Sequence, residues 1–162
     1  MKKKFLVMSD SHGQNDLVQE VIDKESPIDG LIHCGDIEEA FGKDLSFPMY
    51  FVKGNCDSRR IGKKIPYERI IDVCGYKILI CHGHLYHVKY SLQDLINEGI
   101  SQQVDIICFG HTHIPLITKK KDILLLNPGS LAFPERGYQN SYIVLTFSEN
   151  GIHYSLKEVM EY

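Results

Sequence analysis

The chain has 162 residues, a length that suits one domain with its own core, and we expect residues 1–162 to form a single domain. Its 18 lysines and arginines against 21 aspartates and glutamates give a formal net charge of −3, so no global basic field points to nucleic acid or to an acidic membrane. Hydrophobic residues make up 43% and charged residues 24%, which is ordinary for a soluble globular protein, and no segment is long and apolar enough to span a bilayer.

The chain begins with a basic segment, Met1-Lys2-Lys3-Lys4, which precedes a short apolar run over residues 5–8. This run is too short for the core of an export signal, so we interpret the lysines as the solvated start of a first strand. The five cysteines are odd in number and form no Cys-x-x-Cys motif, which favours buried, reduced thiols. These features predict a cytoplasmic protein.

The first half of the chain alternates predicted strands and helices. Apolar side chains recur at helical spacing over residues 15–24, and Ser26-Pro27 ends this predicted helix. The segment 38–46 is interpreted as a weak short helix or a loop. Short apolar runs predict strands over residues 5–8, 30–33 and 49–52.

The middle of the chain predicts a hairpin and a helix. Segments 67–73 and 76–81 are rich in β-formers and meet at Cys74-Gly75. Residues 91–103 predict a helix that Ser91 could cap. The apolar face of this helix would consist of Leu92, Leu95, Ile96 and Ile100.

The last third is mostly β. Turns are expected at Lys121-Asp122 and Asn150-Gly151. Strand–helix units followed by a β-rich tail predict an α/β fold, with either one mixed sheet or two sheets packed face to face and helices outside. Strands are predicted over residues 105–109, 116–118, 123–126, 142–147 and 152–157.

Five short polar clusters each directly follow an apolar run. Strands of one sheet end side by side, so side chains just past their ends can converge although they are far apart in sequence. Asp, Asn and His in this number are more than one metal ion needs and about what two need. The clusters are Asp10-Ser11-His12, Gly35-Asp36, Gly54-Asn55-Cys56-Asp57, His82-Gly83-His84 and Gly110-His111-Thr112-His113.

Each cluster alone also has an ordinary structural interpretation. In extended backbone Asp10 and His12 would lie on the same side and could bind one ion, but the segment could equally be a helix-capping loop. Asp36 could bridge two ions with its two oxygens, or it could sit in a turn after glycine. Asn55 offers a weak, hard amide oxygen, or again a turn residue. A thiolate in such an oxygen and nitrogen site is less expected, so Cys56 is interpreted as a spectator thiol.

Two His-x-His pairs, each following a predicted strand, are improbable as core packing. We assign His82, His111 and His113 to metal binding and interpret His84 as a residue that supports a ligand or faces the substrate. The remaining candidates, His33, His87 and His153, are interpreted as core or surface residues.

Together the predicted ligands divide evenly between two ions. Asp10, His12 and one histidine of the last pair can hold one ion. Asn55, His82 and the other late histidine can hold the second, with Asp36 as the bridge. Two such ions, roughly 3.5–4 Å apart, would clamp a phosphoryl centre, and a metal-bridging hydroxide would attack phosphorus in line without a Ser or Cys nucleophile.

The order of these motifs, D-x-H, G-D, G-N-[HC]-[DE], H-G and G-H-x-H, resembles the calcineurin-like metallophosphoesterase superfamily. The closer resemblance is to the small bacterial and archaeal phosphodiesterases of the YfcE type. The matching segments are Ser9-Asp10-Ser11-His12-Gly13, Gly54-Asn55-Cys56-Asp57, His82-Gly83-His84 and Asn127-Pro128-Gly129-Ser130.

The resemblance implies a four-layer α/β/β/α sandwich of two mixed β-sheets flanked by helices. It also implies two divalent ions, Mn²⁺ first, with Ni²⁺, Zn²⁺, Fe²⁺ or Mg²⁺ as alternatives. The catalytic residues would be Asp36, Asn55, His82 and His111. By this match one ion would be bound by Asp10, His12, Asp36 and His113, and the other by Asp36, Asn55, His82 and His111.

The chain departs from the wider superfamily at two places. Cys56 stands where most members have a histidine that assists the leaving group, and a thiol is a poorer electrostatic partner than an imidazolium. In Phe133-Pro134-Glu135-Arg136 an acidic residue separates the proline and arginine that usually adjoin, which leaves the role of Arg136 open.

The short chain shows no cap domain, so we expect an open site that suits a small-molecule phosphodiester. Cys56, His84 and Arg59 are the candidate substrate-facing residues. The basic residues around Asn55 could meet further phosphates, or they could form a solvated loop. These basic residues are Lys53, Arg59, Arg60, Lys63 and Lys64.

Other functions stay open at this point. The same fold serves as a protein-binding scaffold in the retromer subunit, which resembles this chain but has a degraded metal site. A nuclease or a phosphomonoesterase of the same superfamily is a further alternative, and the acidic charge balance counts against a nuclease. We expect no membrane association, and relatives suggest a homodimer or a homotetramer.

Overall fold

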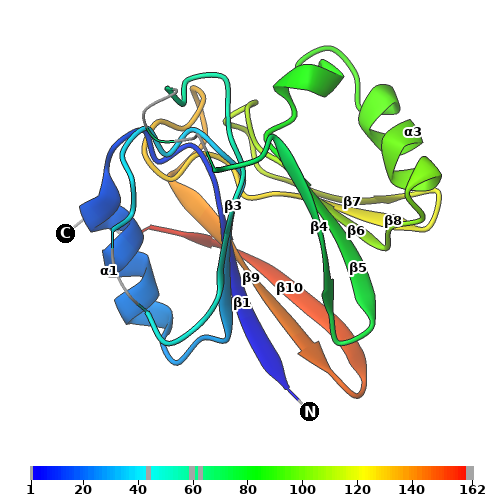
Figure 1. The fold of residues 1–162 in the computed structure, drawn as a ribbon, viewed down its shortest axis with the longest axis horizontal. Coiled ribbons are helices and arrows are strands. Elements are labelled where there is room, and N and C mark those ends of the chain that lie inside the picture. The colour runs from blue at the N-terminus through cyan, green and yellow to red at the C-terminus, as the bar shows by residue number, and fades with distance from the viewer. Residues whose placement is uncertain (1, 43–44, 59–60, 62–63, 160–162) are drawn as a thin grey trace.

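The computed structural model describes residues 2–42, 45–58, 61 and 64–159, and over these residues two five-stranded sheets pack face to face (Figure 1). The first sheet has the strand order β10-β9-β1-β2-β3 and the second β4-β5-β6-β8-β7. Both are mixed, since β1, β2 and β3 run parallel beside antiparallel β9, and β5, β6 and β8 run parallel between antiparallel β4 and β7. The strands are β1 (Lys3–Met8), β2 (Gly30–His33), β3 (Met49–Phe51), β4 (Glu68–Val73), β5 (Tyr76–Cys81), β6 (Ile106–Cys108), β7 (Leu116–Lys120), β8 (Ile123–Asn127), β9 (Ser141–Ser148) and β10 (Gly151–Glu158).

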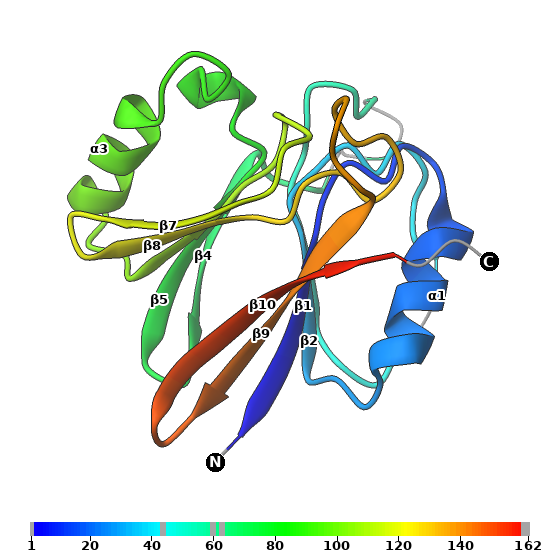
Figure 2. The same ribbon diagram turned by 180° about the vertical axis from the view of Figure 1, so that it is seen from behind.

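A helix covers the outer face of each sheet. Helix α1 (Asn15–Glu25) packs on the first sheet and α3 (Gln93–Ser101) on the second, and a short 3₁₀ turn, η1 (His84–Tyr86), follows β5 (Figures 1 and 2). The order of layers is therefore helix, sheet, sheet, helix. This confirms the predicted α/β/β/α sandwich of two mixed sheets.

Alternation along the strands divides the core into an inner and two outer layers. In β1 the side chains of Phe5 and Val7 enter the layer between the sheets, whereas Leu6 and Met8 face α1. Successive side chains of a strand point to opposite faces, so a strand buried on both sides must be apolar throughout. This explains the continuous apolar runs in the sequence.

The predicted hairpin turns are present. Cys74 and Gly75 have φ of 50° and 85°, and Lys121 and Asp122 have φ of 52° and 63°. Positive φ at both central residues matches the right-handed twist of the flanking strands, as in a type I′ turn. The third turn ends at Gly151, with φ of 110°, between β9 and β10.

Two local predictions differ from the structure. Ile100 is 49% exposed, so the predicted apolar face of α3 is wrong at its last position. Gly99 faces the sheet instead: a Cβ there would stand 2.7 Å from Cδ1 of Ile107, so only glycine lets the helix approach so closely. Helix α3 starts at Gln93 rather than Ser91, but the Ser91 hydroxyl still accepts a hydrogen bond from the Gln93 N–H at 3.1 Å.

A buried polar cluster fastens the end of α1 to the first sheet. Glu25 is 5% exposed and accepts hydrogen bonds from the Tyr142 hydroxyl at 2.6 Å and from Lys157 at 3.1 Å. Lys4 pairs with the same carboxylate at 3.3 Å. The three partners lie on β9, β10 and β1, so one carboxylate joins four elements.

The loops that follow β1, β2, β3, β5, β6 and β8 gather at one end of the sandwich, opposite the N-terminus, in both views (Figures 1 and 2). The loops after β1, β2, β3, β5 and β6 hold the five polar clusters. None of the helices in the described part of the chain is long and apolar enough to cross a membrane.

Candidate metal centre

Six of the seven predicted ligands converge at this end of the sandwich. In the first group, Nε2 of His113 lies 3.0 Å from Oδ1 of Asp10, and Nε2 of His12 lies 3.6 Å from the same oxygen. The two imidazole nitrogens are 3.4 Å apart. At these separations all three atoms can contact one ion at the usual distance of about 2.0–2.2 Å.

A second group adjoins the first. Nε2 of His82 lies 3.2 Å from Oδ2 of Asp36, 3.2 Å from Nδ1 of His111 and 3.8 Å from Oδ1 of Asp10. Asp36 also lies within 4.8 Å of ligand atoms of His12 and Cys56, so its carboxylate adjoins both groups. This is the position that a bridging carboxylate requires.

The histidines are oriented by hydrogen bonds on their other ring nitrogen. His82 donates from Nδ1 to the Cys34 carbonyl at 2.8 Å, and His113 donates from Nδ1 to the Phe133 carbonyl at 2.6 Å. Because a carbonyl only accepts, a proton must sit on each Nδ1, so Nε2 is the nitrogen that faces the carboxylates and can take up either a proton or a metal ion. Partners of this kind fix metal-binding histidines in other proteins.

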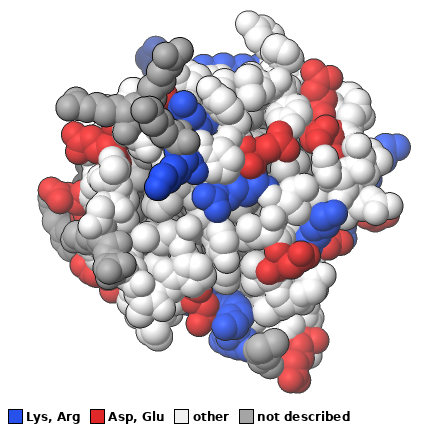
Figure 3. Space-filling view, viewed as in Figure 1, with Lys and Arg blue, Asp and Glu red and all other residues white. Residues whose placement is uncertain are grey.

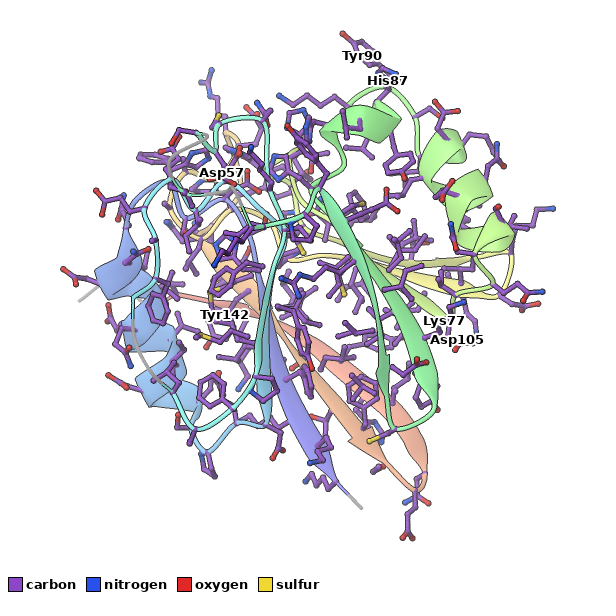
Figure 4. All side chains as sticks on the ribbon, in the orientation of Figure 1. Asp57, Lys77, His87, Tyr90, Asp105 and Tyr142 are labelled. Atoms are coloured by element: carbon purple, nitrogen blue, oxygen red, sulfur yellow. The ribbon has the colours of Figure 1, made fainter. Side chains whose placement is uncertain are left out.

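Two acidic residues that sequence reasoning left out support these groups. Glu38 places Oε1 3.3 Å from Nδ1 of His12. Asp57 accepts hydrogen bonds from the backbone N–H groups of Asp36, Glu38 and Gly54 at 2.8–2.9 Å, and Figure 4 shows it among the side chains gathered at this end. Asp57 is the last residue of the Gly54–Asp57 motif, and this was the one sequence signal that could have identified it as a supporting residue.

The backbone at the centre is strained. We expected extended backbone at Asp10 and His12, and this is wrong, although their side chains do come together. Non-glycine residues at positive φ cost of order 1–3 kcal/mol each and persist only where the surroundings hold them. Hydrogen bonds from the N–H of Asp10 to the Gly35 carbonyl and from the N–H of His12 to the Asp36 carbonyl do this here. Five predicted ligands have positive φ: Asp10 (55°), His12 (46°), Asp36 (58°), His111 (72°) and His113 (58°).

Charge coupling shifts the ionisation of these groups. Burial alone would raise the pKa of Asp10, but hydrogen bonds from His113 and His12 hold it well below its usual range. The hydrogen bond to Asp10 raises the pKa of His12 to about 9, against the opposing effect of burial. Burial and the neighbouring His82 lower the pKa of His111 to about 4. The carboxylate of Asp10 therefore favours the protonated form of His12, whereas burial favours the neutral form of His111.

The end of β8 and the loop that follows it support the backbone around the candidate centre. The Asn127 side chain donates to the Gly110 carbonyl at 3.2 Å and to the Thr112 hydroxyl at 3.0 Å, which braces the segment that holds His111 and His113. The Ser130 hydroxyl donates to the Asp10 carbonyl at 2.8 Å. The motif Asn127–Ser130 thus positions the backbone of the segments that carry Asp10, His111 and His113.

The other predicted site residues differ in their placement. Asn55 is exposed, and its amide nitrogen lies 3.6 Å from Sγ of Cys56, which is its hydrogen-bond contact in the described part of the chain. Desolvation and the carboxylate of Asp36 raise the pKa of the Cys56 thiol to about 11. The His84 ring lies 5.4 Å from that of His82. Arg59, together with Arg60 and Lys63, lies outside the described residues.

The remaining histidines fall where the core and surface interpretations put them. His33 is fully buried, with its Nε2 2.9 Å from the Ser11 hydroxyl and its Nδ1 accepting from the Gly35 N–H at 3.1 Å. His87 and His153 are exposed. His33 therefore shapes the loops that hold the centre without entering it.

Comparisons with known proteins agree with this geometry. The family model for the calcineurin-like phosphoesterase superfamily domain matches residues 4–150. The chain is 35% identical over 146 residues to the probable metallophosphoesterase YsnB of Bacillus subtilis, covering 90% of this chain and 85% of that protein. It is 24% identical over 167 residues to the phosphodiesterase YfcE of Escherichia coli K12, covering 88% and 86%.

Solved structures show the same fold. A predicted phosphoesterase from Streptococcus pneumoniae has a TM-score of 0.85 and 29% identity, covering 98% of this chain and 90% of that chain. Vacuolar Protein Sorting 29 from Cryptosporidium parvum has a TM-score of 0.77 at 16% identity, covering 99% of both chains, which is a likeness of fold alone. With the family model spanning both sheets and the loops of the centre, the chain belongs to the calcineurin-like phosphoesterase superfamily.

Proposed function

We propose that this protein is a dinuclear metal-dependent phosphodiesterase. The observation that carries the proposal is the pair of adjoining ligand groups, Asp10 with His12 and His113, and Asp36 with His82 and His111. The phosphoesterase family is shared with relatives named phosphodiesterase, and the diester preference is our inference for this chain.

The donor set fits divalent cations. In the described part of the chain the carboxylates of Asp10 and Asp36 form no ion pair with lysine or arginine; their charged neighbours are histidines. With Nδ1 of His82 and His113 donating to carbonyls, the Nε2 lone pairs face carboxylate oxygens, and that contact is repulsive unless a proton or a cation stands between them. Oxygen and imidazole ligands suit Mn²⁺, our first choice, and also Ni²⁺, Zn²⁺, Fe²⁺ or Mg²⁺.

The proposed ligand sets follow the two groups. Asp10, His12, Asp36 and His113 would hold one ion, and Asp36, Asn55, His82 and His111 the other. When bound, the ions would polarise the phosphoryl oxygens and make a water molecule nucleophilic near neutral pH. The protein orients these side chains before an ion binds. The Cys34 carbonyl holds the His82 ring, and Asp57 and Asn127 hold the loops that carry other candidate ligands.

Two alternatives remain distinguishable by experiment. A non-catalytic scaffold of the same fold is suggested by the likeness to Vacuolar Protein Sorting 29, and it predicts no turnover. A nuclease would need a basic surface, but basic and acidic side chains are interspersed on the face seen in Figure 3 and the net charge is −3.

The test is hydrolysis of bis-p-nitrophenyl phosphate beside p-nitrophenyl phosphate by metal-stripped protein, with Mn²⁺, Ni²⁺, Zn²⁺ or Mg²⁺ added back. We expect metal-dependent cleavage that favours the diester, and its loss in Asp36→Ala. Asp94→Asn, an exposed aspartate at the start of α3, is the matched control. Full turnover by Asp36→Ala would refute the dinuclear mechanism, and no cleavage by the wild type with any metal would favour the scaffold.

A further inference from the structure

Two exposed aromatic rings lie against the candidate metal centre from different elements. Phe133, in the loop between β8 and β9, is 55% exposed, and its ring centroid lies 5.6 Å from that of His12 in an edge-on arrangement. The His12 ring in turn lies 5.3 Å from that of His113. Phe133 therefore adjoins the first ligand group.

The second ring adjoins the other ligand group. Tyr67, directly before β4, is 49% exposed, and its ring lies 5.8 Å from that of His84. His84 lies 5.4 Å from the ring of His82 and 6.0 Å from that of His111. Ring contacts thus lead from Phe133 to the first ligand group and from Tyr67 to the second, and the two groups adjoin through Asp10, which lies 3.8 Å from Nε2 of His82.

Hydrogen bonds hold the backbone at Phe133 and next to Tyr67. The Phe133 carbonyl accepts the hydrogen bond of His113, and its N–H donates to the Ser130 hydroxyl at 2.8 Å. Near Tyr67, the Lys53 N–H donates to the Pro66 carbonyl at 2.8 Å, which ties the segment after β3 to the segment before β4. The backbone of Phe133 is therefore bonded directly to the predicted ligand His113, and Tyr67 lies in the same β3–β4 connection as Asn55.

We propose that Phe133 and Tyr67 are two platforms for the two ester arms of the substrate, which we infer to be a small phosphodiester with a planar aromatic group on each arm. The inference rests on the proposed function, because it places the phosphorus between the two ligand groups. A phosphodiester bound there has one arm on the side of Phe133 and the other on the side of Tyr67. These exposed aromatic rings offer stacking surfaces that an alkyl arm cannot use fully.

Lys53 has a different role in substrate binding under this proposal. Its ammonium group lies 5.4 Å from the centre of the Tyr67 ring. A cation over one face of the ring holds its orientation and attracts the anionic diester, whatever the arms are. The charge should therefore contribute to affinity and the ring to the choice of arm.

The test measures binding without turnover. Phosphinates carry two P–C bonds and are not hydrolysed, so diphenylphosphinate and dimethylphosphinate mimic diesters with aromatic and alkyl arms. Calorimetric titration of the Mn²⁺-loaded protein should show tighter binding of the diphenyl compound. Tyr67→Ala and Phe133→Ala should each weaken its binding by about 5- to 100-fold and leave dimethylphosphinate nearly unchanged.

Two control variants separate the causes. Tyr90→Ala removes a tyrosine that is 91% exposed and, as Figure 4 shows, points away from the molecule; the affinity ratio of the two phosphinates should not change. Lys53→Met keeps the stem and removes the charge, so it should weaken both compounds by a similar factor. Thermal melting of each variant checks that the fold is retained.

The outcomes separate this inference from the proposed function. If the wild type cleaves diesters but neither Tyr67→Ala nor Phe133→Ala changes the ratio, the platforms are refuted and the phosphodiesterase stands. If only one variant changes it, the two-arm arrangement is refuted. If the metal-loaded wild type neither binds phosphinates nor cleaves diesters, the proposed function fails, and this inference with it.

Discussion

At the scale of single residues, the candidate centre depends on groups that hold the ligands. The convergence of six Asp and His side chains could be predicted, because they stand in short motifs directly after apolar strands. Glu38 could not be predicted, since its contact with His12 arises from a residue at positive φ, 63°, in a loop without regular pattern. Such contacts are set by backbone conformation and leave no periodic signal in the sequence.

Glu38→Gln should weaken metal binding. Its carboxylate lies 3.3 Å from Nδ1 of His12 and favours the tautomer that turns Nε2 toward Asp10. Loss of such a partner reduces metal affinity by about 10- to 100-fold in other proteins. Competition with a chromophoric chelator measures this, with Glu39→Gln as the neighbouring control. Equal affinity in Glu38→Gln and wild type would show that His12 is positioned without Glu38.

Cys56→His should increase hydrolysis of diesters with poor leaving groups. The thiol, with its pKa raised to about 11, stays neutral and is a poor proton donor, whereas an imidazolium at this position could protonate the leaving oxygen. We expect a gain of about tenfold or more for poor leaving groups, and little gain for p-nitrophenolate. A leaving-group series measures it, and an unchanged slope would mean that position 56 does not face the leaving group.

At the scale of elements, most helices and strands could be predicted from periodicity, and their ends could not. The short turn η1 was missed because three residues after Gly83 carry no helical period. The exposure of Ile100 was missed because the close approach of Gly99 to Ile107 depends on the partner sheet. Contacts between elements also explain why the burial of Glu25 has no local signal, since its hydrogen-bond partners lie far away in sequence.

Glu25→Gln should destabilise the fold near neutral pH by about 1–3 kcal/mol, since charged hydrogen bonds become neutral ones. Burial alone would raise the pKa of Glu25, but hydrogen bonds from Tyr142 and Lys157 hold it below its usual value of 4.5. A carboxyl whose folded pKa is lowered stabilises the protein above its unfolded pKa and loses this effect as the pH falls through the folded pKa.

The difference in unfolding free energy between wild type and Glu25→Gln should therefore be constant from pH 7 to about 5 and shrink below the usual pKa of 4.5. Urea unfolding at several pH values measures it. Glu20→Gln on the exposed side of α1 is the matched control. A difference that does not depend on pH would show that the ionised carboxylate is not the stabilising form.

At the scale of the whole molecule, the two sheets share one inner core. Phe5, Ile32 and Leu145 of the first sheet pack with Ile78, Ile106 and Leu124 of the second. The four-layer architecture could be predicted only through the family resemblance, because strand periodicity alone left one sheet or two sheets open. Which strands pair, and which sheet faces pack together, depends on the folded chain as a whole.

We propose that the chain is a single folding unit, because neither sheet can bury its inner face without the other. Metal-free protein should unfold in one transition, with far-UV and near-UV circular dichroism giving the same midpoint. Saturating Mn²⁺ should raise the midpoint, by about 2.7 kcal/mol of stability at a hundredfold excess over Kd. Two separate transitions would contradict a shared core.

The central claim is that two ions share one centre, and the direct measurement is the number of ions bound. Metal-stripped protein is dialysed to equilibrium against Mn²⁺, and the metal-to-protein ratio is measured by mass spectrometry. Two ions per chain in the wild type, and a clear loss in Asp36→Ala but not in Asp94→Asn, is the predicted result. One ion per chain, or two that persist in Asp36→Ala, would contradict a centre bridged by Asp36.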